Sequence, residues 1–415
     1  METFQYRDGR FFCEEVPVES IAERFGTPTY VYSRNRILEN FRRLVDGFRD
    51  ISCLVCYSVK ANSNLAILRL LREAGAGFDI VSGGELARVE RVGANPRAVV
   101  FSGVGKTASE IDAALRARIL MFNVESAGEL EMIESRVRGA ASPEPPGISI
   151  RINPNVAAET HPYISTGETI HKFGVAPEEA LELYCRAAAS PYLKVRGIAC
   201  HIGSQILAVE PFVEALDQVL AVAQRLRALG IGVEDVDLGG GFGIRYAAEP
   251  PLDVNRLARE IIARVRGASY RLILEPGRAL VGDAGILVTR VLYVKQNPLK
   301  NFVITDAGMN DLMRPALYGS YHEIVAVGQS SEKRVRADVV GPLCETGDFL
   351  ARDRELPEAK PGELLALLNA GAYGYVLASN YNTRPRSAEV LVDGEQIQLV
   401  GRRESVEELM SRETP

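Results

Sequence analysis

The sequence contains no tryptophan, only six cysteines and only four histidines in 415 residues. Six scattered cysteines are too few for the disulfide framework of a secreted domain, so they predict a reducing, cytoplasmic setting. The histidines have no short-spaced ligand partner, and no metal site is expected. No apolar run approaches the ~18 residues of a membrane span, and the N-terminus lacks the basic and apolar regions of a secretory signal.

The sequence also lacks a block of positive charge. Its 48 Lys and Arg against 54 Asp and Glu give a net charge of −6. This balance argues against nucleic acid or an anionic membrane as the main partner, and it leaves small molecules as the expected class of ligand. With 47% hydrophobic and 25% charged residues, the chain has the composition of a globular protein with a sizeable core.

Short apolar runs alternate with segments of helical period between about residues 30 and 280. This alternation predicts a (β/α)8 barrel over residues 34–280, with its site at the carboxyl ends of the strands. A doubly wound open sheet is the structural alternative. Eight strands are predicted, near residues 52–60, 77–82, 97–102, 120–125, 147–153, 194–202, 233–239 and 271–276.

Several helices of the barrel have clear signals in the sequence. Three Ser/Thr-x-x-Glu patterns, Ser82–Glu85, Thr107–Glu110 and Ser126–Glu129, predict capping boxes at helix starts. Amphipathic helices are expected from Asn35 to Phe48 and from Pro211 to Leu229.

After Arg278 the sequence changes to short alternating runs separated by turn residues. This pattern predicts an all-β domain over residues 281–415. The first 33 residues are expected to join it, with Thr29–Tyr32 as an added strand.

Polar residues gather at the predicted strand ends. Lys60 ends the first strand, His201 and Ser204 lie at the sixth, Gly239–Gly243 follows the seventh, and Glu275–Arg278 follows the eighth. A desolvated lysine amine is a nucleophile toward carbonyls, glycine amides can approach a phosphate, and a carboxylate can pair with a ring nitrogen. Together these groups meet the three needs of pyridoxal 5′-phosphate (PLP).

Each of these residues also has a plainer interpretation. Lys60 could be a strand-end lysine that reaches solvent, and His201 a satisfied core histidine. The glycine run by itself proves only a tight turn, and Glu275 could form a salt bridge with Arg278.

The motifs resemble those of the diaminopimelate decarboxylase family, PLP enzymes of the alanine racemase-like barrel class. The resemblance covers about residues 25 to 395. It is carried by Tyr57–Asn62, Gly77–Glu85, His161–Gly167, His201–Gln205, Glu275–Arg278, Asp306–Asn310, Arg314–Tyr318 and Gly341–Asp348. In the last of these, Thr346 stands where the family often has serine.

The resemblance implies a role for each site residue. Lys60 would carry PLP, His201 would stack on its ring, and Glu275 would pair with the ring nitrogen. Cys344 would be the acid that protonates the substrate carbon. The phosphate would be bound by Ser204, Gly241, Gly277, Arg278 and Tyr373, and the substrate by Arg278, Arg314, Tyr318, Glu345 and Tyr373.

The resemblance also implies a homodimer with shared active sites, in which the β domain contributes to the site and to the dimer interface. Cys344 and Glu345 would enter the site from the other subunit. The expected reaction is decarboxylation of meso-2,6-diaminopimelate to L-lysine, the last step of lysine biosynthesis. Two arginines, Arg278 and Arg314, with Glu345 complement an amino acid whose far end is itself a zwitterion.

Three alternatives remain at this stage. One is a related decarboxylase acting on ornithine, arginine or carboxynorspermidine. Another is an amino-acid racemase on the same barrel, and the third is a PLP-binding regulator without catalysis.

Overall fold

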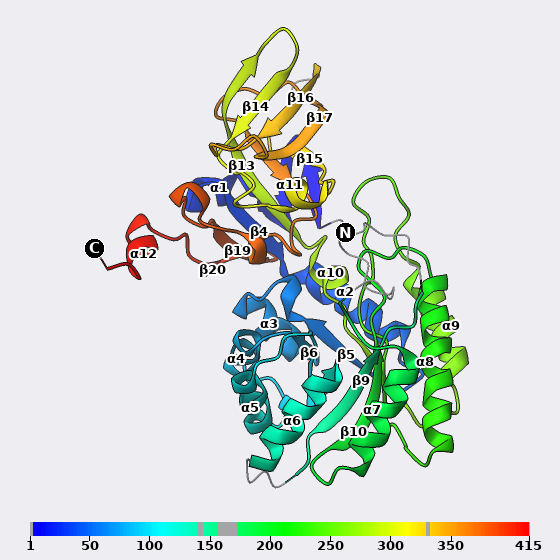
Figure 1. The fold of residues 1–415 in the computed structure, drawn as a ribbon. Coiled ribbons are helices and arrows are strands. Elements are labelled where there is room, and N and C mark those ends of the chain that lie inside the picture. Colours follow the sequence, from blue (N-terminus) through cyan, green and yellow to red (C-terminus); the bar gives the residue numbers. More distant parts are fainter. Residues whose placement is uncertain (1–2, 140–143, 157–171, 329–332, 415) are drawn as a thin grey trace. The chain divides into compact units, whose positions relative to one another are not determined.

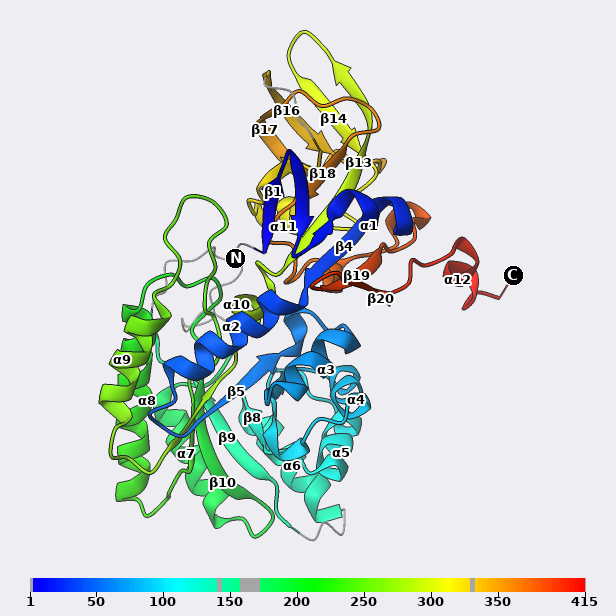
Figure 2. The same ribbon diagram turned by 180° about the vertical axis from the view of Figure 1, so that it is seen from behind.

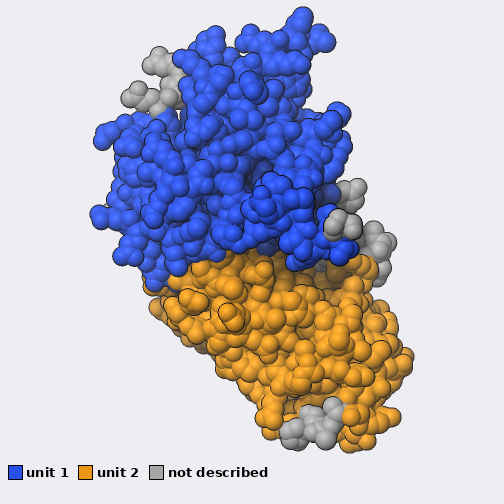
Figure 3. Space-filling model, turned by 90° about the vertical axis from the view of Figure 1, so that its left-hand side faces the viewer, with its two compact units in different colours: residues 1–40, 245–249, 280–415 blue, residues 41–244, 250–279 orange. Residues whose placement is uncertain are grey.

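The computed structural model describes residues 3–139, 144–156, 172–328 and 333–414. The chain divides into two compact units, coloured separately in Figure 3. The barrel unit comprises residues 41–244 and 250–279, and the β unit comprises residues 1–40, 245–249 and 280–415. The predicted His161–Gly167 motif lies outside the described residues.

The barrel unit contains a closed ring of eight parallel strands in the order of the sequence. The last strand pairs with the first through Leu272–Leu274 and Cys53–Val55. This closure confirms the predicted (β/α)8 barrel, and the open-sheet alternative is wrong. The strands are β5 Cys53–Ser58, β6 Gly77–Ile80, β7 Val99–Phe101, β8 Met121–Val124, β9 Gly147–Ile152, β10 Lys194–Cys200, β11 Asp235–Asp237 and β12 Arg271–Leu274.

Helices cover the outside of the barrel (Figures 1 and 2). In α8 (Glu210–Ala228), Phe212, Leu216, Val219 and Leu226 are buried, as the amphipathic pattern predicted. None of the helices in the described ranges is long and apolar enough to span a membrane. The other helices of the barrel unit are α3 Leu65–Glu73, α4 Gly83–Arg91, α5 Ala108–Ala117, α6 Ala127–Gly139, α7 Pro177–Ala189 and α9 Val254–Val265, while α2 Arg34–Gly47 and α10 Arg278–Val281 contain residues of both units.

The predicted capping boxes are only partly correct. At Thr107 and Glu110 the box forms in both directions. The hydroxyls of Ser82 and Ser126 accept hydrogen bonds from the amides three residues later, as predicted. However, the carboxylates of Glu85 and Glu129 accept from the amides of Val81 and Glu125 instead of from the capping serines. Each glutamate thus satisfies the amide that directly precedes the capping serine.

The β unit is built on a sheet with the strand order β17-β16-β14-β13-β4-β19-β20. Thr29–Ser33, β4, pairs with both β13 and β19, which confirms that the N-terminal segment adds a strand to this domain. Buried side chains such as Val31, Val288 and Val390 form its core. The strands are β1 Phe4–Arg7, β2 Arg10–Cys13, β3 Val16–Pro17, β4 Thr29–Ser33, β13 Gly285–Gln296, β14 Asn301–Thr305, β15 Ile324–Ala326, β16 Arg334–Val340, β17 Phe349–Pro357, β18 Leu364–Leu367, β19 Ala388–Asp393 and β20 Gln396–Gly401, and the helices are α1 Val18–Phe25, α11 Arg314–Tyr318 and α12 Val406–Met410.

Candidate active site

Lys60 lies just beyond the carboxyl end of β5, in a short 3-10 turn formed by Val59–Ala61. Its ammonium group donates to the carboxylate of Asp79 on β6 at 2.7 Å, and its side chain is 34% exposed. Asp79 itself is fully buried. The lysine is therefore held at the barrel end by a charge-assisted hydrogen bond and does not simply extend into solvent.

A group of buried polar side chains surrounds Glu275, which follows β12. Ser102 and Asn123 donate to its Oε1 atom at 3.3 and 3.4 Å. Asn123 also donates to Asp237, at 3.0 Å. Burial, followed by repulsion from Asp237 and Asp79, raises the pKa of Glu275 well above its usual range. The site thus gathers three carboxyl groups, those of Glu275, Asp237 and Asp79, close enough to repel one another when ionised.

His201 follows β10 and is fixed by the glycine loop. The amide of Gly240 donates to its Nδ1 atom at 3.0 Å, which places the ring proton of a neutral imidazole on Nε2. Burial, followed by the positive charges of Arg151 and Lys60, lowers the pKa of His201 well below its usual range. The ring is therefore neutral near pH 7 and presents an uncharged aromatic face.

The glycine loop Gly239–Gly243 packs closely against the segments that follow β10 and β12. A Cβ atom on Gly240 would lie 2.2 Å from the carbonyl oxygen of Glu275, and one on Gly241 would lie 2.4 Å from that of Gly203. Gly241 also has a φ of +97°, which side chains rarely allow. The backbone can approach its neighbours this closely only with glycine at both positions.

Three further predicted phosphate ligands, Ser204, Gly277 and Arg278, lie in the segments that follow β10 and β12. Arg278, which is buried, donates to the hydroxyl of Ser204 at 3.1 Å. Gly277 directly precedes Arg278, the first residue of α10. The barrel unit therefore brings a cationic guanidinium and a hydroxyl together next to a glycine-rich turn, a combination suited to an anion.

The remaining predicted residues belong to the β unit. Arg314 and Tyr318 are the two ends of α11, and Arg314 is buried. Tyr373 adopts a φ of +55°. A bulky residue with this backbone conformation is strained, and such strain is commonly kept at functional sites.

Cys344 and Glu345 are exposed at the tip of a turn. The turn is anchored at Asp348, whose carboxylate accepts from the amides of Leu343 and Met309 at 2.7 and 2.6 Å. The amide of Cys344 also donates to Asn382, at 2.8 Å. Cys344 and Glu345 are thus exposed on a firmly held backbone, and the Glu345 carboxylate accepts from the amide of Gly347 at 3.1 Å.

Several site residues were not predicted from the sequence. Asp79, Asn123 and Asp237 lie within apolar strands, and Asp348 closes the Cys344 turn. A polar residue that interrupts a buried parallel strand was the available signal, because such strands are otherwise continuously apolar.

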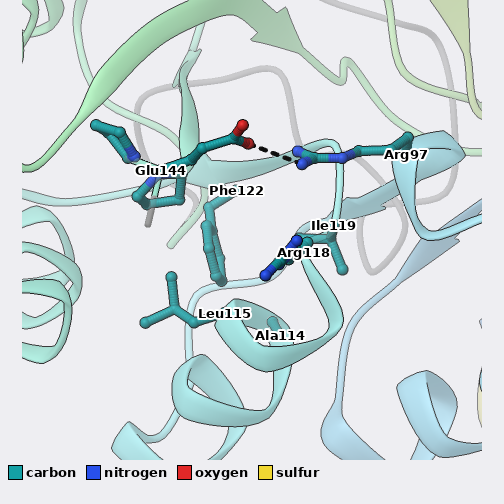
Figure 4. Close-up of a pocket in the computed structure, with 9 residues that line it drawn as sticks. Arg97, Ala114, Leu115, Arg118, Ile119, Phe122 and Glu144 are labelled. Atoms are coloured by element: carbon teal, nitrogen blue, oxygen red, sulfur yellow. Dashed lines mark hydrogen bonds and ion pairs between the residues drawn. The ribbon is translucent and has the colours of Figure 1, made fainter. Parts of the chain in front are cut away.

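Figure 4 shows a small pocket of the barrel unit that contains none of these residues. It lies at the amino-terminal ends of β7, β8 and β9, where Arg97 and Glu144 form an ion pair at 3.0 Å. Barrel enzymes place their sites at the opposite, carboxyl-terminal end. We therefore do not assign a catalytic role to this pocket.

The barrel residues fit PLP by the chemistry of their groups. The Oδ1 atoms of Asp79 and Asn123 are buried without a hydrogen-bond partner, and Glu275 and Asp237 face each other as acids. A protonated pyridine ring would supply the positive charge and the donor that this cluster lacks. Lys60 adds an amine, and His201 adds a flat neutral ring. The glycine loop adds backbone amides that can approach a phosphate closely.

Comparison with known proteins identifies the class. A family model described as "Pyridoxal-dependent decarboxylase, pyridoxal binding domain" matches residues 34–282. The barrel and its strand-end residues thus define a pyridoxal-dependent decarboxylase.

The relatives of this chain identify the family within the class of pyridoxal-dependent decarboxylases. Diaminopimelate decarboxylase of Pseudomonas aeruginosa is 52% identical over 414 residues, covering 100% of this chain and 99% of the relative. Two solved diaminopimelate decarboxylases, each in complex with L-lysine, are similar in structure. The Helicobacter pylori enzyme has a TM-score of 0.92 and 43% identity over 95% of this chain and 98% of its own, and the M. jannaschii enzyme has a TM-score of 0.94 and 38% identity over 100% and 98%. This chain belongs to the diaminopimelate decarboxylase family.

Replacing Glu275 with glutamine should slow turnover while PLP stays attached. A glutamine amide cannot carry the negative charge that keeps a ring nitrogen protonated, so kcat should fall on the order of 10²-fold. Steady-state kinetics, together with the absorbance of bound PLP, measure the two effects separately. An unchanged kcat would show that Glu275 does not tune the cofactor.

Proposed function

We propose that this protein is a PLP-dependent decarboxylase that converts meso-2,6-diaminopimelate to L-lysine and carbon dioxide, the last step of lysine biosynthesis. The observation that carries this proposal is the whole-length match, since 52% identity extends over 414 residues of a diaminopimelate decarboxylase. Ornithine, arginine and carboxynorspermidine decarboxylation and racemization are not favoured by these relatives. The proposal is tested by incubating the PLP-loaded protein with the meso isomer and identifying L-lysine and carbon dioxide as the products.

The residues of the barrel unit bind and tune the cofactor. Lys60 would hold PLP covalently, with Asp79 positioning its amine, and Ser204, Gly241, Gly277 and Arg278 would hold the phosphate together with Tyr373. The neutral ring of His201 would lie against the cofactor, and Glu275 would keep its ring nitrogen protonated. Bound PLP supplies an electron sink for the electron pair that the departing carboxylate leaves behind.

The residues of the β unit recognise the substrate and deliver a proton. Arg314 and Arg278 bind carboxylates, Glu345 binds the distal ammonium, and Tyr318 and Tyr373 complete the contacts with the substrate. The Cys344 thiol donates its proton to the carbon that has lost carbon dioxide. In this scheme the β unit contributes to both the active site and the dimer interface.

The active protein in this proposal is a homodimer. Cys344 of the partner subunit and Glu345 of the partner subunit complete each site, which is supported by the exposure of both residues on a turn that Asp348 anchors. We also propose a cytoplasmic location, because all six cysteines are free and a reducing compartment keeps them so.

Replacing Arg314 with alanine should damage catalysis far more than cofactor binding. Loss of a buried charged partner should lower kcat/KM for meso-diaminopimelate on the order of 10²–10³-fold. Arg314→Lys is the matched control: it keeps the charge but loses the planar fork, so its activity should be intermediate. PLP content, measured by absorbance, should be unchanged in both variants. A parallel loss of PLP would contradict the assignment to substrate.

A further inference from the structure

The search for unassigned function leads to a buried histidine of the β unit. His322 is fully buried, and neither the sequence motifs nor the roles above include it. Its Nε2 atom lies 2.8 Å from Nη1 of Arg314, and its Nδ1 atom lies 2.8 Å from the carbonyl oxygen of Leu368. Each ring nitrogen therefore has a defined partner.

The chemistry of those partners fixes the tautomer. A guanidinium can only donate, so Nε2 of His322 must accept from Arg314. A carbonyl oxygen can only accept, so Nδ1 must carry the proton and donate to Leu368. The ring is consequently neutral, with an acceptor directed at Arg314 and a donor directed at the loop that follows β18.

Two other contacts restrain the same arrangement. The guanidinium carbon of Arg314 lies 4.7 Å from the centre of the Tyr246 ring, and the rings of Tyr246 and His322 are 5.5 Å apart at an interplanar angle of 82°. The backbone oxygen of His322 accepts from Arg354 of β17 at 2.9 Å. His322 and Tyr246 therefore restrain the Arg314 guanidinium from two directions, and Arg354 anchors the backbone of the histidine.

We propose that His322 is a positioning residue that sets the guanidinium plane of Arg314 for binding a carboxylate of the substrate. The inference rests on the proposed function, which assigns Arg314 to the substrate. A guanidinium recognises a carboxylate through two parallel hydrogen bonds, so its orientation matters as well as its charge. The hydrogen bond from Nη1 of Arg314 to His322 and the contact with the face of the Tyr246 ring together define the orientation of the guanidinium group.

Two substitutions separate the two contacts of the ring. His322→Gln keeps an acceptor near the position of Nε2, whereas His322→Asn keeps a donor near the position of Nδ1. We expect the asparagine variant to raise KM for meso-diaminopimelate on the order of tenfold, with kcat and PLP content retained. The glutamine variant should restore KM to within about threefold of the parent value.

Crystal structures of both variants provide a readout that does not depend on activity. Arg314 should keep its stack on Tyr246 in the glutamine variant and rotate in the asparagine variant. Parent-like KM values in both variants, or equal KM increases accompanied by loss of PLP, would overturn the inference. If the protein does not act on meso-diaminopimelate, the proposed function fails, and the orientation of Arg314 in the two variants then decides the positioning role by itself.

Discussion

Lys60→Ala should abolish turnover, with kcat/KM falling on the order of 10³-fold or more, because no other group replaces a covalent nucleophile. The purified variant should also lack a covalently attached pyridoxyl group after borohydride reduction. The structure supports this expectation because Lys60 lies at the carboxyl end of β5, with its amine held at 2.7 Å from Asp79. In the parent protein the label should appear on the peptide that contains Lys60.

Two control variants separate the loss of the covalent bond to PLP from the loss of a positive charge and from the general effect of replacing a lysine. Lys60→Arg keeps a cation opposite Asp79 but cannot form the covalent bond, so it should be as inactive as the alanine variant. Lys194→Ala removes an exposed lysine that pairs with Glu234, and it should retain both label and activity. Recovery of the label on a peptide without Lys60 would contradict the assignment.

A mixture of two inactive variants, Lys60→Ala and Cys344→Ala, should regain activity when the subunits are exchanged. If each site takes Lys60 from one chain and Cys344 from the other, a mixed dimer contains one intact site and one doubly defective site. Random exchange at equal amounts should therefore restore about a quarter of the parent activity. The exposure of Cys344 and its anchoring through Asn382 motivate this expectation.

The exchange itself must be shown independently of activity. Two differently tagged variants, co-purified through both tags, provide mixed dimers for the assay. The double variant that carries both substitutions in one chain is the matched control, because its mixed dimers with Lys60→Ala contain no intact site. Absence of recovery in verified mixed dimers would mean that each chain supplies its own thiol, or that Cys344 only packs.

The barrel was predictable because the repeating pattern of its apolar residues is local in the sequence. Each buried strand is a short apolar run, and each covering helix carries an apolar stripe, so α8 was placed to within one residue at each end. Lys60, His201 and Glu275 became candidate site residues because they stand where such runs end.

The missing elements depend on tertiary context. Strand β17 contains the consecutive charged residues Arg352, Asp353, Arg354 and Glu355, which obscure its strand pattern in the sequence, and it is an edge strand that pairs only with β16 in the sheet order. Edge strands tolerate charges that a central strand would exclude. The contact of His322 with Arg314 was equally hidden, because both ring partners depend on how α11 and the loop after β18 pack.

The most direct measurement is carbon dioxide release by the PLP-loaded protein from five compounds assayed side by side: meso-diaminopimelate, its LL isomer, ornithine, arginine and lysine. We predict release from meso-diaminopimelate alone, with one L-lysine formed for each carbon dioxide. The stereochemical control is the LL isomer, which has the same charges and length as the meso compound. Equal or faster release from ornithine or arginine, or no release from any of the five despite bound PLP, would contradict the proposed function.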